Sequence, residues 1–383
     1  MFEECISSIR ESGLLREIRD RNTPQGRILS IEGKNLINFS SNDYLGLCNH
    51  GEIIKAITDS LGSFGSGGGA SRLLSGGTAL HGELEKELSL IKQTEGALLY
   101  STGYQANTGS IPALSGEDTV ILSDELNHAS IIDGCRLSKS PVRIFGHKDT
   151  NEVESILRKI RKQQILIVTE SVFSMDGDIA PLDSLYHLAM QYNALLYIDD
   201  AHATGVLGEG RGSLQHFDLP PKGFVVQMGT LSKAVGSLGG FIAASSEIIR
   251  WLVNRSRSLI YTTALPPHTV AASLKALRII RDEPSRLDKL WNNRETLMSE
   301  LQGLGMDTGA SETPIIPILL DDNSSALRLA DFFISKGIFA PAIRYPTVKR
   351  PRIRLSLSSS HTDEDIYSLV KTIKEALDCG LLS

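Results

Sequence analysis

Six short apolar runs alternate with helical stretches between Gly96 and Gly240, and this alternation restricts the possible folds more than any other feature of the chain. The runs have β-rich compositions and lack the regular polar positions of a half-exposed strand. Continuous apolar strands joined by helices indicate a mostly parallel sheet that is covered on both faces. We therefore predict an α/β fold. The runs lie at residues 97–100, 119–122, 142–145, 165–168, 194–198 and 224–226.

The chain on either side of these runs indicates two further parts. Before them, residues 27–31 and 34–39 flank Glu32-Gly33, a two-residue connection typical of a β-hairpin. After them, helical patterns alternate with apolar strands, which is typical of a smaller α+β domain. The helical patterns lie at 268–281, 290–301, 325–336 and 364–377, and the strands lie at 315–320, near 339–344 and at 352–357. We predict an N-terminal arm and hairpin at 1–48, a large domain at 49–280 and a small C-terminal α+β domain at 281–383.

Two segments near the N-terminus have distinctive patterns. Apolar residues recur at roughly helical spacing from Ile6 to Ile18 with arginines between them, which predicts an amphipathic arm whose basic face could bind substrate or solvent. Residues 62–77 are too rich in glycine for the interior of a helix or strand. A flexible linker is one explanation of that composition. Because a helical pattern follows directly at 78–91, we expect instead a loop whose backbone approaches a ligand closely.

The composition favours chemistry on small molecules. The formal net charge of -6 over 383 residues gives no basic footprint for nucleic acid. The four cysteines are scattered without a CxxC pair, which suggests neither a disulfide framework nor a metal site. The N-terminal residues lack the pattern of a signal peptide, and no apolar run approaches the roughly 20 residues of a membrane span. We expect a cytoplasmic protein without nucleic-acid or membrane partners.

Lys233 is the residue whose position most clearly indicates a chemical role. It follows the last apolar run and precedes a stretch of small residues, so it lies at the end of a predicted strand. A lysine held there can form a Schiff base with an aldehyde cofactor, and the hydroxyls of Thr230 and Ser232 are close enough in sequence to bind a phosphate. Pyridoxal phosphate carries both groups. For an isolated SxK tripeptide, a surface lysine in a glycine-rich turn would be the better interpretation.

Polar clusters also follow other predicted strands, where parallel sheets bind their ligands. Gly103 lies in a turn that opens a helix, whose amides could hold a phosphate. Each cluster alone has an ordinary explanation: His128 could be a satisfied histidine, an acidic pair could cap a helix, and Ser174 could begin a turn. A purely structural sheet has no reason to line one edge with all of them. The clusters lie at 101–107, 124–130, 170–178, 199–202 and 230–233.

With these residues in view, the chain resembles the α-oxoamine synthase family of pyridoxal-phosphate enzymes over nearly its whole length. The resemblance implies an aspartate-aminotransferase-like fold, pyridoxal 5'-phosphate as the cofactor, and a homodimer with a shared active site. The motifs that carry it are FSSNDYLGL, GSGGGASRLLSGGTALHGELE, STGYQAN, HASIIDG, ESVFSMDGD, DDAHATGVLG and TLSKAVGSLGG.

The resemblance implies roles for the residues of these motifs. Lys233 resembles the Schiff-base lysine, Asp199 the carboxylate paired with the pyridine nitrogen, and His128 the imidazole stacked on the cofactor ring. We expect these three residues to be catalytic. The other expected cofactor contacts are Ser174 and His202 to the phenolic oxygen, Gly103, Tyr104 and Thr230 to the phosphate, and Thr262 and Thr263 to the phosphate of the neighbouring subunit.

The resemblance also implies substrate contacts. Relatives usually carry a glycine-containing spacer before the arginine strand, whereas residues 348–351 are shorter and lack glycine. Arg352 and Arg354 therefore remain alternatives for the arginine that binds the substrate carboxylate, and we expect Arg354. The expected substrate contacts are Arg16, Asn42, His128, Arg344, Thr347 and Arg354.

The reaction implied by the resemblance is the decarboxylative condensation of an amino acid with an acyl thioester. The SSNDYLG and SRLLSG motifs and the compact length of the chain favour L-alanine and either pimeloyl-CoA or a pimeloyl carrier protein as the substrates, as in biotin biosynthesis. Glycine C-acetyltransferase or another α-oxoamine synthase is the nearest alternative. A non-catalytic partner subunit is disfavoured because Lys233, Asp199 and His128 are all present. An aminotransferase of the same fold would need no acyl thioester.

Overall fold

The computed structural model describes residues 2–12, 14–161 and 163–382, which form two units. The larger unit contains His50–Ser174 and Ile179–Leu287, and the smaller contains Met1–Asn49, Met175–Asp178 and Asp288–Ser383. The expected division at 48/49 and 280/281 into three parts stays a prediction. The structure groups the N-terminal hairpin with the C-terminal segment in one unit.

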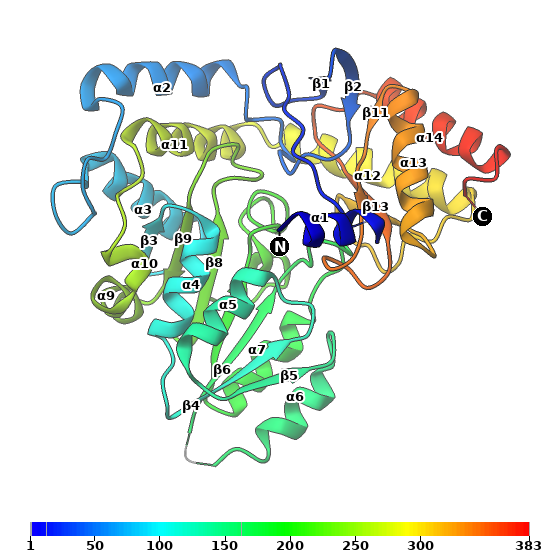
Figure 1. Ribbon diagram of the computed structural model, residues 1–383. Coiled ribbons are helices and arrows are strands. Elements are labelled where there is room, and N and C mark those ends of the chain that lie inside the picture. The colour runs from blue at the N-terminus through cyan, green and yellow to red at the C-terminus, as the bar shows by residue number, and fades with distance from the viewer. Residues whose placement is uncertain (1, 13, 162, 383) are drawn as a thin grey trace. The chain divides into compact units, whose positions relative to one another are not determined.

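A seven-stranded sheet forms the centre of the larger unit (Figure 1). Its order is β3-β9-β8-β7-β6-β4-β5, and the pairings among β4, β5, β6, β7 and β8 are all parallel. This confirms the predicted mostly parallel sheet. β9 pairs antiparallel with both β3 and β8 and was not predicted, because it begins within a run of small residues. The strands are β3 (Gly96–Tyr100), β4 (Thr119–Asp124), β5 (Val142–Phe145), β6 (Gln164–Glu170), β7 (Leu195–Asp199), β8 (Val225–Thr230) and β9 (Gly240–Ala244).

The strands are apolar throughout because each of them contributes to two cores. Successive side chains of a strand point to opposite faces of the sheet. In β4, Val120 and Leu122 belong to one buried cluster and Ile121 to the other, and β6 alternates in the same way. The remaining core residues come from the helical connections between strands and from residues 248–259, which follow β9, so the sheet is covered on both faces.

Helices account for most of the remaining chain in the larger unit. α2 extends to Phe64, so the prediction that residues 62–64 lie outside a helix is wrong; the glycine-rich loop starts at Gly65, whose φ is 73°. The helices are α2 (Gly51–Phe64), α3 (Ala79–Ile91), α4 (Gly103–Ala113), α5 (Ala129–Ser138), α6 (Thr150–Leu157), α7 (Leu182–Gln191), α8 (Ser213–His216), α9 (Ser246–Arg255), α10 (Arg257–Ile260) and α11 (Pro267–Asp282).

The smaller unit has two three-stranded sheets, ordered β1-β2-β11 and β10-β13-β12. The predicted hairpin is confirmed: Ile31 pairs with Lys34, and Glu32 and Gly33 both have positive φ, as a type I′ turn requires. The strands are β1 (Ile28–Ile31), β2 (Lys34–Asn38), β10 (Ile315–Leu319), β11 (Ile338–Phe339), β12 (Ala342–Ile343) and β13 (Arg352–Ser356). The smaller unit also contains the helices α13 (Asn323–Ser335) and α14 (Asp363–Asp378). Helix α12 (Ser285–Gly303) begins in the larger unit and continues into the smaller one.

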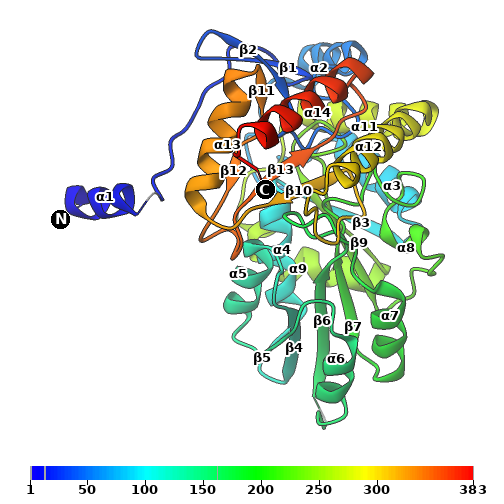
Figure 2. The ribbon, with the colours of Figure 1, turned by 90° about the vertical axis from the view of Figure 1, so that its right-hand side faces the viewer.

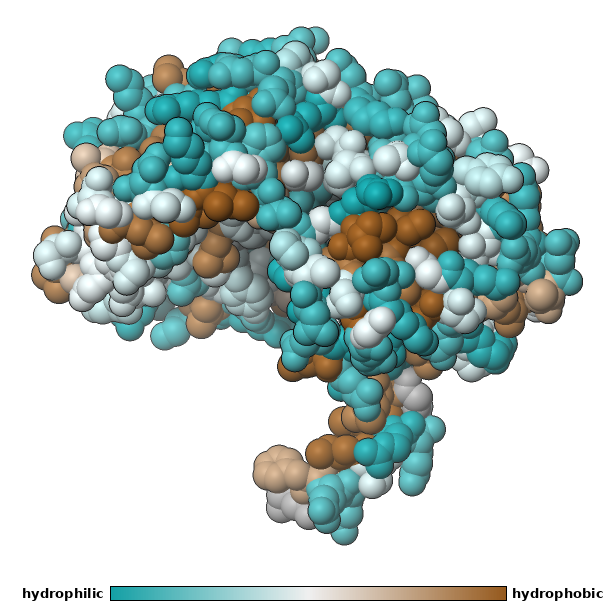
Figure 3. Space-filling view, turned by 90° about the horizontal axis from the view of Figure 1, so that it is seen from above, coloured by the Kyte–Doolittle hydropathy of each residue, from teal (hydrophilic) through white to brown (hydrophobic). Residues whose placement is uncertain are grey.

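Among the described residues of the predicted amphipathic arm, the helical ones are those of α1 (Phe2–Glu11). The hydroxyl of Ser12 donates to the carbonyls of Ser8 and Ile9 at 2.9 and 3.0 Å, and such bonds compete with continuation of a helix. None of the described residues of α1 is buried, and α1 extends away from the sheets of its unit (Figure 2). Its surface mixes apolar and hydrophilic side chains (Figure 3). In the described part of the chain, no helix is long and apolar enough to cross a membrane.

A buried ion pair holds the segment that follows β7. Lys92 Nζ lies 2.8 Å from Asp200 Oδ2, and both side chains are fully buried. Asp200 also accepts hydrogen bonds from the backbone amide and the hydroxyl of Ser213. Gly212 makes room for the pair, since a Cβ there would lie 2.3 Å from Lys92 Nζ. The pair thus joins the end of α3 to the segment between β7 and α8.

We expect Lys92→Met to lower the free energy of unfolding by about 3–5 kcal/mol, because it leaves the Asp200 carboxylate buried without its counter-ion. The matched control is Arg158→Met, which removes an exposed ion pair with Glu154 and should cost no more than about 0.5 kcal/mol. Urea denaturation of both variants measures the difference. A loss below about 1 kcal/mol for Lys92→Met would contradict the structural role of the pair.

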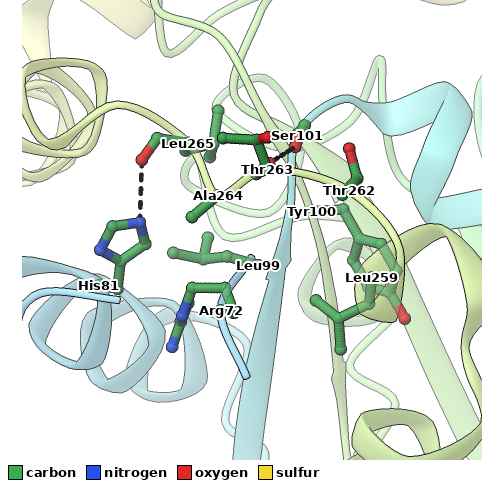
Figure 4. A pocket seen from close by; sticks show the side chains of 10 residues that line it. All are labelled: Arg72, His81, Leu99, Tyr100, Ser101, Leu259, Thr262, Thr263, Ala264 and Leu265. Carbon is green, nitrogen blue, oxygen red and sulfur yellow. Dashed lines mark hydrogen bonds between the residues drawn. The ribbon is translucent and has the colours of Figure 1, made fainter. Parts of the chain in front are cut away.

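His81 joins α3 to the segment Thr262–Leu265 (Figure 4). Its Nε2 donates to the carbonyl of Leu265 at 3.1 Å, and its Nδ1 accepts from the amide of Thr78 at 3.1 Å. Burial, assisted by the positive charge of Arg72, lowers the pKa of His81 to about 4. The imidazole is therefore neutral in the folded chain at neutral pH.

Because the folded-state pKa of His81 lies below its ordinary value of 6.5, the unfolded chain takes up the proton first as pH falls. The stability contributed by neutral His81 is complete above about pH 6.5 and is lost as pH falls towards about 4. We expect His81→Gln to flatten the decline of the free energy of unfolding across this window, whereas His216→Gln, at an exposed histidine, should leave it unchanged. Equal slopes for wild type and His81→Gln in urea titrations would contradict this assignment.

Candidate active site

A cavity of about 220 Å³ opens at the carboxyl ends of β6, β7 and β8 in the larger unit. Parallel strands end at the same edge of a sheet, which is why clusters distant in sequence meet there. The structure thus brings six of the expected cofactor residues to one cavity. Its lining residues are Thr102, Gly103, Tyr104, Asn107, His128, Ser130, Glu170, Asp199, Ala201, Met228, Thr230, Ser232, Lys233 and Leu238.

Lys233 and His202 form the amine end of the site. Lys233 follows β8, and its Nζ lies 2.7 Å from Nε2 of His202, which is buried in the turn after β7. When the lysine amine is protonated it has only donors, and His202 then accepts through Nε2. This contact holds the amine in a defined place inside a partly buried pocket, as a reactive lysine requires.

Asp199 supplies the buried carboxylate. It is the last residue of β7, and only 4% of its surface is exposed. Its Oδ2 accepts from Asn107 Nδ2 at 2.8 Å, and its Oδ1 accepts from the amide of Ala201 at 2.9 Å. Each oxygen therefore has one N–H donor, and these donors stabilise the ionised form.

Glu170 places a second buried carboxyl group beside Asp199, since the two residues are register partners in β6 and β7. Burial, and then the negative charge of Asp199, raise the pKa of Glu170 well above its ordinary value. Two carboxylates this close cannot both ionise readily, so this position favours the protonated form of Glu170.

His128 caps the N-terminus of α5, where its Nδ1 accepts from the amide of Ser130 at 3.2 Å and lies 2.7 Å from the Ser130 hydroxyl. Burial lowers the pKa of His128, the positive charge of Lys233 lowers it further, and Asp199 acts in the opposite direction. The ring of Tyr104 packs edge-on against the imidazole, with 6.3 Å between ring centroids. His128 is therefore a neutral, oriented ring at the wall of the cavity.

A further part of the cavity lining is suited to an anion. Thr102 caps α4 by accepting from the amide of Gln105 at 3.1 Å, and the first amides of a helix have no intrahelical acceptors. The hydroxyls of Thr230 and Ser232 lie 2.8 Å apart at the end of β8. Gly240 allows this close packing, because a Cβ there would lie 2.5 Å from the Thr102 carbonyl oxygen.

These groups fit pyridoxal 5'-phosphate. The fixed amine of Lys233 can react with the cofactor's aldehyde, and the buried carboxylate of Asp199 can pair with its protonated ring nitrogen. The N-terminus of α4, with the hydroxyls of Thr230 and Ser232, can bind its phosphate. Sequence reasoning did not single out Asn107, Ser130 or Glu170, although each lies in a polar cluster at a strand end. Their positions within those clusters were the only signal available.

Four expected cofactor residues lie outside the described lining of this cavity, namely Ser174, His202, Thr262 and Thr263. Ser174 is half-buried in the turn after β6. Thr262 and Thr263 line a separate pocket of about 10 Å³, where the hydroxyl of Ser101 donates to the Thr263 carbonyl at 3.1 Å (Figure 4). Thr263 is exposed, so it is accessible to another chain.

The expected substrate residues other than His128 belong to the smaller unit. Arg16 donates to the hydroxyl of Thr347 at 3.0 Å, and Arg344 donates to the carbonyl of Leu15 at 2.6 Å. Arg354 is buried in β13 and donates to Asn42 Oδ1 at 3.1 Å.

Arg352 differs from Arg354, although both lie on the same face of β13. It forms an ion pair with Asp176 and also donates to the carbonyl of Met175 at 3.0 Å. A guanidinium already paired with a carboxylate is a poor receptor for another one. This pairing disfavours Arg352 as the arginine that binds a substrate.

The chain matches the family model for aminotransferase class I and II over residues 34–373. It is 48% identical over 370 residues to a putative 8-amino-7-oxononanoate synthase from Thermodesulfovibrio yellowstonii, covering 96% of this chain and 95% of that relative. It is 43% identical to the 8-amino-7-oxononanoate synthase of Thermoanaerobacter pseudethanolicus, covering 98% and 96% of the two chains. The structure of a serine palmitoyltransferase from S. paucimobilis with PLP and myriocin bound matches with a TM-score of 0.94 and 28% identity, covering 100% of this chain and 98% of that one. The chain therefore belongs to the 8-amino-7-oxononanoate synthase group of the α-oxoamine synthase family, within aminotransferase classes I and II.

Proposed function

We propose that this 8-amino-7-oxononanoate synthase condenses L-alanine with a pimeloyl thioester in biotin biosynthesis, releasing carbon dioxide and the thiol. The observation that carries the proposal is the placement of the Lys233 amine, the Asp199 carboxylate and the His128 ring around one cavity. In the reaction, the α-carbon of alanine loses its proton and forms a bond with the thioester carbonyl carbon, and the leaving thiolate takes up a proton. The alanine carboxylate departs as carbon dioxide, and the α-carbon then takes up a proton in its place.

Pyridoxal 5'-phosphate supplies an electrophilic aldehyde and an electron-poor ring that accepts charge from the carbon next to a bound amine. Asp199 would hold the proton on the ring nitrogen, because its carboxylate is buried and fixed by two N–H donors. The amides at the start of α4, with Gly103, Tyr104 and Thr230, would hold the phosphate.

Lys233 is the proposed base that removes the α-proton of alanine. Its Nζ lies 2.7 Å from Nε2 of His202, and this contact fixes the amine at the cavity that Asp199 and His128 also line. Once the amine has taken the proton, its charge also favours the anionic character that develops on the carbonyl oxygen of the thioester.

His128 is proposed to act on the acyl substrate. A neutral imidazole that accepts through Nδ1 carries its proton on Nε2, and it can donate that proton in a hydrogen bond. Such a bond would polarise the thioester carbonyl or assist loss of the carboxylate after condensation. Ser174 and His202 remain the proposed contacts to the phenolic oxygen of the cofactor.

The smaller unit is proposed to supply the remaining substrate contacts. Arg354 would bind the carboxylate of alanine and orient the Cα–H bond, with Asn42 holding the guanidinium. The pairing of Arg352 with Asp176 supports this choice. Arg16, Arg344 and Thr347 are the proposed contacts for the acyl substrate.

We further propose a cytoplasmic homodimer in which Thr262 and Thr263 reach the phosphate bound to the partner subunit. The exposure of Thr263 supports this assignment. The four cysteines are all free in the structure, which suits a reducing compartment.

The function is tested by thiol release from the protein supplied with pyridoxal 5'-phosphate. We expect release and a product of the mass of 8-amino-7-oxononanoate with L-alanine plus pimeloyl-CoA, and no release with glycine plus acetyl-CoA. The reverse result would assign the chain to glycine C-acetyltransferase. A pimeloyl carrier protein tested in parallel decides between the two thioester donors.

Lys233→Ala tests the proposed base. We expect kcat to fall by at least about 10²–10⁴-fold, the range contributed by a positioned general base. The matched control is Lys222→Ala, which removes an exposed lysine and should leave kcat unchanged. Circular dichroism would verify that both variants are folded, and steady-state turnover near the wild-type rate in folded Lys233→Ala would rule out the assigned role.

A further inference from the structure

We propose that Asn107 is a positioning residue that connects Asp199 to His128 and sets the tautomer of that histidine, an inference that rests on the proposed function. Asn107 lies in the middle of α4 and is completely buried. The two N–H groups of its side chain donate to two different partners: Asp199 Oδ2 at 2.8 Å and the hydroxyl of Ser130 at 2.8 Å. One amide thus contacts the proposed partner of the ring nitrogen and the neighbour of His128.

The orientation of this amide is set by Tyr197. The hydroxyl of Tyr197 donates to Asn107 Oδ1 at 2.8 Å and lies 2.8 Å from the Ser110 hydroxyl. Burial raises the pKa of Tyr197 well above its ordinary value, so the phenol keeps the proton that it donates. The reversed amide would turn its oxygen towards the Asp199 carboxylate, where two acceptors would face each other.

The tautomer of His128 follows from the same chain of donors. Because Asn107 donates to the Ser130 hydroxyl, that hydroxyl is free to donate its own proton to His128 Nδ1, 2.7 Å away. The amide of Ser130 donates to the same nitrogen at 3.2 Å. Nδ1 therefore carries a lone pair and Nε2 carries the hydrogen. His128 acts as an N–H donor at Nε2 and not as a base there.

Asn107 consequently connects Asp199 and Ser130, which belong to different segments of the chain. Asp199 ends β7, and Ser130 with His128 begins α5, so neither segment orients the other through the backbone alone. The bond to Asp199 stabilises its ionised form, and the bond to Ser130 directs a proton towards His128. Loss of Asn107 should change both, whereas loss of the Ser130 hydroxyl should change only the histidine.

The first experiment measures the tautomer of His128 in the full-length chain labelled with ¹⁵N-histidine, before and after addition of pyridoxal 5'-phosphate. The His128 signals are assigned by their disappearance in His128→Gln. We expect wild type to carry its proton on Nε2, and Ser130→Ala and Asn107→Leu each to contain a mixture of tautomers. A proton on Nδ1 in wild type, or an unchanged tautomer in Asn107→Leu, would overturn the inference.

The second experiment measures the protonation of the cofactor's ring nitrogen with ¹⁵N-labelled pyridoxal 5'-phosphate. We expect a protonated nitrogen in wild type and in Ser130→Ala, and a shift towards the unprotonated form in Asn107→Leu. Leucine has the same number and branching of side-chain heavy atoms as asparagine, so a residue that only fills space would leave this signal unchanged. Tyr197→Phe keeps every contact of Asn107 except the one that orients it, and we expect a smaller shift in the same direction.

Kinetics then separate positioning from folding. We expect Asn107→Leu to lower kcat at least tenfold with little change in the KM for alanine, and its loss of thermal stability to match that of Ser110→Ala. Wild-type kcat in folded Asn107→Leu would overturn the proposal. Both spectroscopic measurements need only the chain and its cofactor, so they test Asn107 even if the alanine and pimeloyl-CoA assay fails.

Discussion

The buried ion pair between Lys92 and Asp200 is the interaction on which the site depends. Removing two charges from water costs several kcal/mol, and the cost is offset only when geometry is good and further hydrogen bonds are made. Here Ser213 supplies them. Because Asp200 is committed to this pair, the chain leaving β7 is fixed, and Asp199, one residue earlier, faces the cavity that Lys233 also lines.

The parallel sheet determines which side chains meet in that cavity. Its register places Glu170 beside Asp199 at the ends of β6 and β7, so two carboxyl groups share one buried environment. Their surroundings differ: Asp199 accepts from Asn107 and from the amide of Ala201, whereas burial, and then the charge of Asp199, raise the pKa of Glu170. A single anion is left where a cationic ring nitrogen can be bound.

Local patterns predicted most of the architecture. The six apolar runs became β3 to β8 with ends shifted by a few residues, since burial on both faces leaves an unambiguous signal. β9 was missed because small residues at its start hide the apolar run, and they are small because Gly240 packs against Thr102. The arm was predicted too long because helical periodicity does not reveal that Ser12 competes for the last carbonyls of α1.

The sequence by itself determined the chemical groups of the site, since Lys233, Asp199, His128 and the glycine turn before α4 all follow strands in recognisable motifs. Only the tertiary structure decided how those groups are connected. Asn107 and Asp199 are 92 positions apart, and their contact exists only because α4 packs beside the end of β7. Hydrogen bonds act over about 3 Å and leave no periodic trace in a sequence. The orientation of the carboxylate and the tautomer of the imidazole are therefore properties of the folded chain.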